Sequence, residues 1–275
     1  MTVDNLLFFA KQHIHSDHAK ILLAELLNKN PLELLTCLDE EVDQEIVEKY
    51  AQEVLALQEG KPLQYVIGNV NFYGNKFYVN ENVLIPRFET EELVENVLYL
   101  YEEYFDGQKV DVCDIGTGSG AIAITLAKEE KNMKVWASDI SFEALEVAES
   151  NNKKYDAGVT FLQGDMVEPL YGLRFDIIVS NPPYIPTVEV VDSLVKDNEP
   201  NVALFGGEDG LKFYRIIVEN LHKIAKEKFI LAFEHGYNKN QEIEELILKH
   251  YPNAKVIHKK DMQGKDRMSF AIVGE

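Results

Sequence analysis

The fold is decided by residues 110–127, which read VDVCDIGTGSGAIAITLA. Residues 110–115 are mostly apolar and β-branched, which predicts a buried strand of a parallel sheet, and residues 121–127 predict a helix. A glycine-rich turn between them lets the backbone approach a ligand closely, while the helix start presents free N–H groups. Strand, turn and helix in this order are typical of the first unit of a nucleotide-binding α/β fold. The residues of this turn are Gly116, Thr117, Gly118, Ser119 and Gly120.

Strand-like and helix-like stretches alternate from residue 83 to the end of the chain. This alternation predicts a Rossmann-like α/β fold with a doubly wound, mainly parallel sheet. Residues 185–207 are expected to form a long, irregular connection. The expected strands are 110–115, 134–138, 159–162, 175–180 and 229–233, with two more near residues 256 and 270, and the expected helices are 89–104, 121–127, 141–155, 208–226 and 240–250.

The first 60 residues predict helices instead, with an apolar stripe that begins at Ile46 and ends at Leu57. Two short aromatic runs around Gly74 and Asn75 predict a β-hairpin. The sequence therefore divides into a helical domain at residues 1–68, a hairpin linker at 69–82 and a catalytic domain at 83–275. We expect the helical domain to recognise the substrate.

A second motif follows the strand predicted at residues 175–180, namely Asn181, Pro182, Pro183 and Tyr184. The carboxyl edge of a parallel sheet is where such folds bind ligands. Asn181 offers a side-chain amide and Tyr184 a flat ring. Pro182 offers a backbone carbonyl oxygen as an acceptor but has no backbone N–H to donate. Together they suit a planar group that bears an NH2. The alternative is an ordinary strand that ends in a proline-rich turn.

The glycine turn alone does not identify the ligand. Gly116, Gly118 and Ala121 also satisfy the loose dinucleotide pattern, and Asp139 lies roughly 20 residues on, where a ribose-binding acid belongs. NAD and S-adenosylmethionine both carry that ribose. The Asn181 motif favours S-adenosylmethionine, because hydride transfer has no use for such a pocket and methyl transfer to a planar amine or amide does.

Composition sets the outer limits of function. The chain has 275 residues, of which 46% are hydrophobic and 10% aromatic, as in a globular protein with a core and a small extra domain. We expect a cytoplasmic protein, because no apolar run approaches the length of a membrane span and the start is not that of an export signal. Cys37 and Cys113 are expected to be small buried hydrophobic residues, and no metal site is expected.

Charge bears on the choice of partner. The net charge is −20, from 47 acidic and 27 basic residues. Enzymes that act on nucleic acids normally carry a basic groove, because phosphate neutralisation supplies most of their affinity. A protein or a small molecule is therefore the expected acceptor, with no nucleic-acid substrate and no membrane partner.

The chain resembles the protein-(glutamine-N5) methyltransferases that modify peptide chain release factors. The resemblance covers residues 62–275, and one departure is Phe88, where the family usually has proline. DNA amino-methyltransferases also contain an Asn-Pro-Pro-Tyr motif, so this class of enzyme stays an alternative. The segments that carry the resemblance are residues 65–68, 72–74, 83–87, 89–91, 114–123, 138–141, 181–185, 199–200, 203–204, 206–207, 209–211, 214–215, 234–237, 260–261, 264 and 266–267.

The resemblance implies a class I methyltransferase that uses S-adenosylmethionine. The residues of the glycine turn would hold the amino-acid end of the donor, Asp139 the ribose, and Asp165 and Met166 the adenine. Asn181 would border both substrates. The acceptor would be the side-chain amide of the glutamine in the Gly-Gly-Gln loop of a release factor, so that the enzyme modulates translation termination. Asn181 and the carbonyl of Pro182 would accept the two amide hydrogens, with Pro183 and Tyr184 against the amide. A non-catalytic module that binds release factors would need a broken donor site.

Overall fold

The computed structural model describes residues 1–189 and 197–274, and the chain divides into two compact units. The smaller unit contains residues 1–69, and the larger unit contains most of the chain from Val70 onward. Among the described residues, no helix combines the length and the apolar character needed to cross a bilayer.

The smaller unit is helical, as predicted for residues 1–60. Tyr50, on the predicted apolar stripe, is fully buried and donates its hydroxyl proton to the carbonyl oxygen of Ala19 at 3.0 Å. His15 caps the second helix through Nδ1, which accepts from the backbone N–H of Asp17. The elements are α1 (Val3–Ala10), α2 (Ser16–Leu26), the short 3-10 helix η1 (Glu33–Thr36), α3 (Gln44–Gln58) and α4 (Leu63–Ile67).

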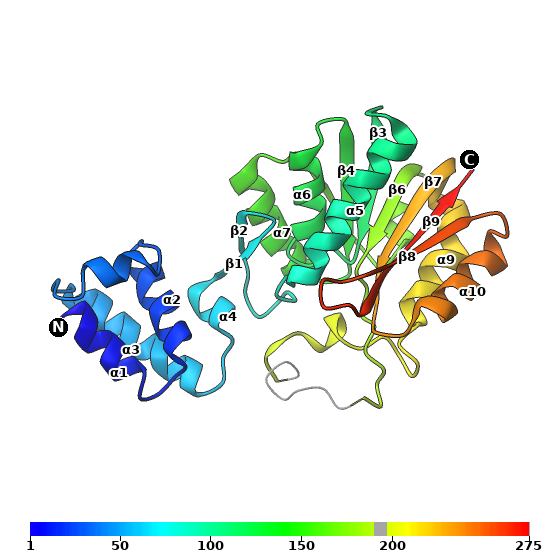
Figure 1. Ribbon diagram of the computed structural model, residues 1–275. Helices are drawn as coiled ribbons and strands as arrows, with labels where there is room; N and C mark the ends of the chain where they lie inside the picture. The colour runs from blue at the N-terminus through cyan, green and yellow to red at the C-terminus, as the bar shows by residue number, and fades with distance from the viewer. Residues whose placement is uncertain (190–196, 275) are drawn as a thin grey trace. The chain divides into compact units, whose positions relative to one another are not determined.

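The larger unit is built on a seven-stranded sheet with the order β5-β4-β3-β6-β7-β9-β8 (Figure 1). All neighbouring strands are parallel except β9, which is antiparallel to both β7 and β8. The predicted mainly parallel sheet is therefore confirmed. Its strands are β3 (Val110–Ile115), β4 (Met133–Asp139), β5 (Thr160–Gln163), β6 (Phe175–Ser180), β7 (Ala225–Glu234), β8 (Lys255–Lys260) and β9 (Asp266–Val273).

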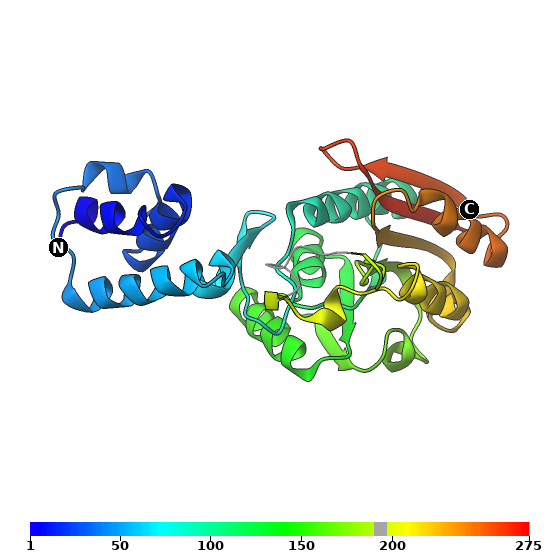
Figure 2. The ribbon, with the colours of Figure 1, turned by 90° about the horizontal axis from the view of Figure 1, so that it is seen from below.

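Helices cover both faces of this sheet, as a doubly wound fold requires (Figures 1 and 2). Along β3, Val110 and Val112 point into the core under α5 and α6, whereas Cys113 and Ile115 point into the core under α9 and α10. Both cysteines of the chain are buried, as expected. The helices are α5 (Phe88–Phe105), α6 (Ala121–Glu129), α7 (Phe142–Tyr155), α9 (Lys212–Ile224) and α10 (Asn240–His250), with short 3-10 helices η2 (Glu168–Leu170) and η3 (Asn201–Ala203).

The strand order reverses between β3 and β6, and this reversal positions the two sequence motifs. Asp114 lies level with Val179 in the parallel ladder. The hydroxyl of Ser180, the last residue of β6, donates to the carbonyl oxygen of Ile115, the last residue of β3, at 2.6 Å. The glycine turn and the Asn181 motif therefore leave the sheet side by side, at the switch point where open α/β sheets bind ligands.

The predicted hairpin is confirmed as β1 (Asn69–Phe72) and β2 (Asn75–Tyr78). Tyr73 and Gly74 have φ values of 49° and 71°, which suit a two-residue hairpin turn. Phe72 and Phe77 are fully buried in the core under α5 and α6. The hairpin thus belongs to the packed core of the larger unit.

The predicted helix at residues 208–226 was too long at both ends. It begins at Lys212, because Gly210 has a φ of 76° and Asp209 Oδ1 accepts from the backbone N–H of Leu211 in a turn. It ends at Ile224, because Lys226 already lies in β7, where Nζ contacts Asp111 and Asp176 at 2.7 Å each. Of the connection predicted at 185–207, residues 190–196 lie outside the described residues.

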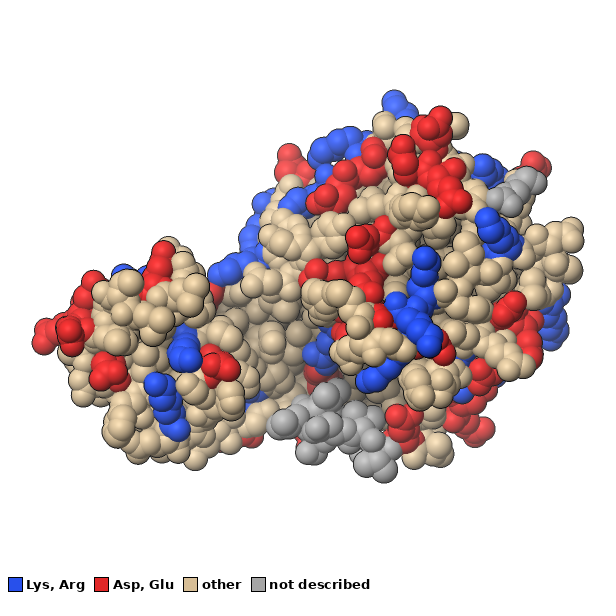
Figure 3. All heavy atoms as spheres, viewed as in Figure 1, with Lys and Arg blue, Asp and Glu red and all other residues tan. Residues whose placement is uncertain are grey.

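Charged side chains of both signs cover the face of the molecule seen in Figure 3, where Lys and Arg are interspersed with Asp and Glu. In places on that face the Lys and Arg side chains lie next to one another, with Asp and Glu side chains beside them.

Candidate functional site

A cavity of about 250 Å³ opens at the carboxyl edge of the sheet. It brings together seven of the twelve residues that the sequence nominated for the site: Gly116, Gly118, Asp139, Asp165, Met166, Asn181 and Pro183. The other lining residues are Asn82, Val83, Leu84, Ile140, Ser141, Ala144, Pro200, Val202, Ala203, Lys212, Phe213 and Ile216.

The three glycines of the turn play different parts. Gly116 and Gly118 have φ values of 75° and 55°, and a Cβ on either would meet no atom within 4 Å. Their backbone is therefore open to the cavity, which leaves room for a ligand. A Cβ on Gly120 would lie 2.8 Å from Ile124 Cδ1 and 3.2 Å from Ala148 Cβ, so this glycine allows α6 and α7 to pack closely.

Thr117 and Ser119 are buried and do not line the cavity. The Thr117 hydroxyl donates to Asp114 Oδ2 at 2.6 Å, and the Ser119 carbonyl oxygen accepts from Asn151 Nδ2 at 2.9 Å. These hydrogen bonds hold the glycine turn in place on its buried side, away from the cavity. Asp114 itself is fully buried, and burial raises its pKa to about 7. Its Oδ1 has no hydrogen-bond partner among the described residues.

Asp139 ends β4 and braces the glycine turn from the side. Its Oδ2 accepts from the backbone N–H of Gly118 at 2.8 Å, and its Oδ1 accepts from the backbone N–H of Ser141 at 3.0 Å. Burial raises the pKa of this carboxyl, and the backbone bonds partly oppose that shift. Each carboxylate oxygen has a second lone pair, so Asp139 can still accept from a ligand in the cavity.

The end of β5 supplies Asp165 and Met166. Asp165 is exposed, whereas Met166 is buried with a φ of 46°, an uncommon value for a residue with a side chain. Ser138 holds that backbone by donating to the carbonyl oxygen of Met166 at 3.1 Å. The thioether side chain thus becomes an apolar wall beside Asp139.

The Asn-Pro-Pro-Tyr segment is held in place by glycines from elsewhere in the chain. A Cβ on Gly206 would collide with the carbonyl oxygen of Pro183, and one on Gly210 with the carbonyl oxygen of Tyr184. A Cβ on Gly236 would lie 3.2 Å from the Tyr184 ring. Asn181 and Pro183 line the cavity, while Pro182 and Tyr184 do not.

Asn181 contacts two buried polar groups beside the cavity. Its Nδ2 donates to Thr90 Oγ1 at 3.3 Å, and the Thr90 hydroxyl donates to Glu234 Oε2 at 2.7 Å. Glu234 is only 2% exposed, and burial raises its pKa to about 7. Burial and the nearby Glu234 charge also raise the pKa of Tyr184, to about 12, so its hydroxyl stays protonated.

Sequence reasoning missed several lining residues. Ser141 could have been found, because its hydroxyl accepts from the backbone N–H of Ala144 at 3.0 Å, and a serine between a strand and a helix is a typical cap. Leu84, Phe213 and Ile216 reach the cavity from segments far apart in the chain, and no local pattern marks them.

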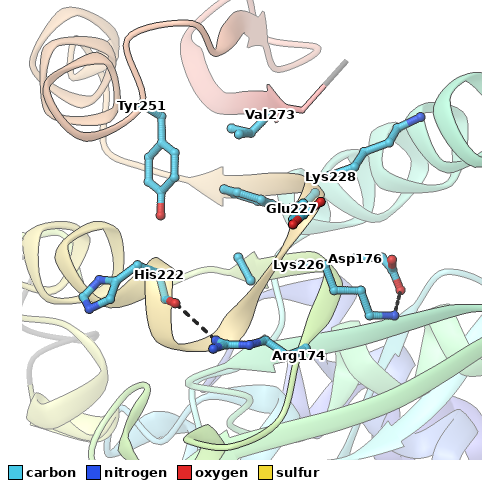
Figure 4. Close-up of a pocket in the computed structure, with 10 residues that line it drawn as sticks. Arg174, Asp176, His222, Lys226, Glu227, Lys228, Tyr251 and Val273 are labelled. Carbon is cyan, nitrogen blue, oxygen red and sulfur yellow. Dashed lines mark hydrogen bonds and ion pairs between the residues drawn. The ribbon is translucent and has the colours of Figure 1, made fainter.

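A second, wider hollow of about 780 Å³ lies at the opposite edge of the sheet, where β6 and β7 begin (Figure 4). Arg174 donates to the carbonyl oxygen of His222 at 3.2 Å, and Lys226 bonds to Asp176 at 2.7 Å. None of the residues nominated by the sequence lines it. The cavity at the carboxyl edge is therefore the candidate site.

Comparisons with known proteins agree with this geometry. A model described as the methyltransferase small domain matches residues 93–200, and one described as the PrmC N-terminal domain matches residues 8–68. The solved structure of a methyltransferase from Pyrococcus furiosus has a TM-score of 0.54 and 20% identity, covering 74% of this chain and 90% of its own, which supports the fold alone.

Two curated relatives are similar over most of their length. The release factor glutamine methyltransferase of Bacillus anthracis is 46% identical, with 92% of this chain and 91% of the relative covered. The protein of the same description from Streptococcus pneumoniae is 38% identical, with 94% and 92% covered. On this evidence the chain belongs to the release factor glutamine methyltransferase family.

Proposed function

We propose that this chain transfers a methyl group from S-adenosylmethionine to the side-chain nitrogen of the glutamine in the Gly-Gly-Gln loop of peptide chain release factors. One observation carries the proposal. The open glycine turn after β3 and Asn181 after β6 leave adjacent strands at the same level and line one cavity. This arrangement supports the proposal, because a direct transfer requires the donor and the acceptor to lie next to each other.

The residues of the cavity fit the donor. Gly116 and Gly118 leave room beside their backbone for its amino-acid end, while Thr117, Ser119 and Gly120 support the turn. Asp139 has free lone pairs for ribose hydroxyls, and Met166 offers an apolar face to adenine. When bound, S-adenosylmethionine supplies a methyl group on a positively charged sulfur.

The acceptor end of the cavity fits a primary amide. An amide nitrogen is a poor nucleophile because its lone pair is delocalised into the carbonyl group. Asn181 lines the cavity and Pro182 follows it in the chain without lining the cavity. We expect Asn181 Oδ1, together with the carbonyl oxygen of Pro182, to accept the two amide hydrogens, which orients the nitrogen and stabilises the positive charge that develops on it. Tyr184 does not line the cavity, and we expect its ring to support the Asn-Pro-Pro-Tyr segment, where it packs against Gly236. Alignment of this kind can supply several kcal/mol, on the order of 7–11 in favourable cases.

The partner follows from the family and from the charge. The named relatives are release factor glutamine methyltransferases, and a net charge of −20 suits a protein acceptor better than a nucleic acid. We expect the helical unit at residues 1–69 to recognise the intact release factor in the cytoplasm, where the modification modulates termination of translation.

A transfer assay with competing acceptors tests the proposal. The purified chain would receive methyl-labelled S-adenosylmethionine with a release factor, a short Gly-Gly-Gln peptide or duplex DNA. Label is expected in the intact release factor, weakly in the peptide and not in DNA. Label in DNA alone would instead identify a DNA amino-methyltransferase. Calorimetry should also show binding of the demethylated donor product and not of NAD.

A further inference from the structure

Asn181 can serve the acceptor amide only if its own amide is turned the right way. The carboxamide has one end that donates and one end that accepts. If Oδ1 faces the acceptor, it can accept a hydrogen bond from the substrate nitrogen. If Nδ2 faces the acceptor instead, two N–H donors meet and no hydrogen bond forms. Catalysis by Asn181 therefore requires something in the protein that distinguishes the two ends.

We propose that Thr90 and Glu234 form a relay that fixes the Asn181 amide with Nδ2 toward the protein and Oδ1 toward the acceptor; this proposal rests on the proposed function above. The relay runs from Glu234 Oε2 to the Thr90 hydroxyl at 2.7 Å and from Thr90 Oγ1 to Asn181 Nδ2 at 3.3 Å. Glu234 and Thr90 are positioning residues, since neither lines the cavity.

The direction of the relay follows from the proton count. An ionised carboxylate has no proton to donate, so the hydroxyl of Thr90 must give its single proton to Glu234. Thr90 Oγ1 is then left with lone pairs only, and the group of Asn181 that meets it must be a donor. That donor is Nδ2, and Oδ1 is consequently left for the cavity. One buried negative charge thus sets the orientation of the neutral Asn181 amide, both through Thr90 and through the hydrogen bond that Asn181 makes to Glu234.

The surroundings of Glu234 allow this arrangement above about pH 7, where the carboxyl is ionised. Glu234 is raised in pKa by burial and by Glu89, and the hydrogen bonds from Thr90 and Asn181 and the charge of Arg267 favour its ionised form. Tyr184 and Tyr214 also face this carboxyl and remain protonated. Tyr214 donates to the backbone carbonyl oxygen of Glu234 at 2.8 Å, which anchors the end of β7.

Protonation of Glu234 removes the direction of the relay. A carboxylic acid can donate to Thr90, whose hydroxyl proton can then turn toward Asn181 and attract Oδ1. The rate of methyl transfer should therefore fall as the pH falls through about 7, the value to which burial raises the pKa of Glu234. Thr90→Val removes the hydroxyl that links Glu234 to Asn181, and Glu234→Gln replaces the carboxylate by a group that can donate or accept.

The test measures kcat for methyl transfer to an intact release factor. Thr90→Val and Glu234→Gln should each lower kcat by roughly tenfold or more, while calorimetric affinity for the demethylated donor stays unchanged. Thr90→Ser, which keeps the hydroxyl, should restore most of the rate. Glu95→Gln is the matched control, because Glu95 is an exposed carboxylate on the same helix as Thr90. The fall of kcat toward acid pH should be weaker in Glu234→Gln than in the control.

A double-mutant cycle separates this role from any other. In an Asn181→Ala background, Glu234→Gln should cause no further loss of kcat, because Glu234 acts through Asn181. Losses that multiply in the double variant, or single variants with the kcat of the wild type, would overturn the relay. If Glu234→Gln fails to fold, equal kcat for Thr90→Ser and Thr90→Val overturns it instead.

NMR spectroscopy can test the orientation of the Asn181 amide without any measurement of methyl transfer. The two Nδ2 proton resonances of Asn181 in the free protein should move in Thr90→Val and stay in place in Glu95→Gln, and unmoved resonances would contradict the relay. A wild-type chain that methylates no release factor would refute the proposed function itself. A wild-type chain that does so, with variants that are equally active, would refute the relay alone.

Discussion

Among single residues, Asn181 is expected to contribute most to methyl transfer. Asn181→Ala removes an acceptor from the reacting amide, and kcat should fall about 10²-fold or more, as on loss of one preorganised partner. Donor affinity and melting temperature should change little, since the side chain lies at the cavity wall. Asn181→Asp should also retain little activity, because it lacks the NH2 that binds Thr90 and brings a second carboxylate toward Glu234. Steady-state kinetics with a release factor measure both, and a wild-type rate for Asn181→Ala would exclude a catalytic hydrogen bond from the acceptor amide to Asn181.

Asp139 should both bind the donor and stabilise the glycine turn. Asp139→Ala removes the acceptor of two backbone N–H groups as well as of the ribose hydroxyls, so it should weaken donor binding by roughly 1–3 kcal/mol and lower the melting temperature. Asp139→Asn keeps one acceptor oxygen and should lose less of both. Calorimetry with the demethylated donor is the measurement, and an unchanged affinity in Asp139→Ala would contradict the assigned role.

Glu234 should impose a pH dependence on stability. Burial raises its pKa from 4.5 to about 7, so between these values the folded protein keeps a proton that the unfolded chain has released. The free energy of unfolding therefore falls as pH rises through this window, by about 3 kcal/mol at most. Buried Asp114 acts in the same direction. Glu234→Gln should lose less of its melting temperature between pH 5 and pH 8 than the wild type or Glu95→Gln, and identical pH profiles would refute this reading.

At the scale of elements, the sequence predicted what local patterns encode. The buried strand at Val110–Ile115, the glycine turn and α10 at Asn240–His250 were found because strand and helix periodicities are strong there. The start of α9 was missed, because Gly210 serves the contact with Tyr184 and not the helix. The Thr90 to Glu234 bond spans 144 residues in sequence, so no local pattern could reveal it.

The glycines that contact the Asn-Pro-Pro-Tyr segment should be sensitive to substitution. Gly210 has a φ of 76°, and an added Cβ would collide with the carbonyl oxygen of Tyr184. Gly210→Ala should therefore displace the motif, lower kcat at least tenfold and destabilise the fold by roughly 1–3 kcal/mol. Gly107→Ala is the control, since its φ is 68° but its Cβ would meet nothing within 4 Å. Equal kcat in the two variants would show that strain alone, and not contact with the motif, matters.

In the whole molecule, we expect the larger unit to bind the donor and the helical unit to recognise the release factor. The larger unit contains every residue that lines the cavity, and the helical unit has its own buried core around Tyr50. Deletion of residues 1–68 should therefore spare binding of the demethylated donor and reduce turnover on an intact release factor. The rate on a Gly-Gly-Gln peptide should be low with or without the helical unit. Unaltered turnover on the intact factor after the deletion would remove the recognition role.

Tandem mass spectrometry can identify the atom that receives the methyl group. A release factor treated with the wild-type chain and methyl-labelled S-adenosylmethionine would be digested and sequenced by fragmentation. We expect one labelled methyl on the side-chain nitrogen of the glutamine in the Gly-Gly-Gln loop, and far less label after treatment with Asn181→Ala. Label on another residue, or an unmodified glutamine after complete reaction, would contradict it.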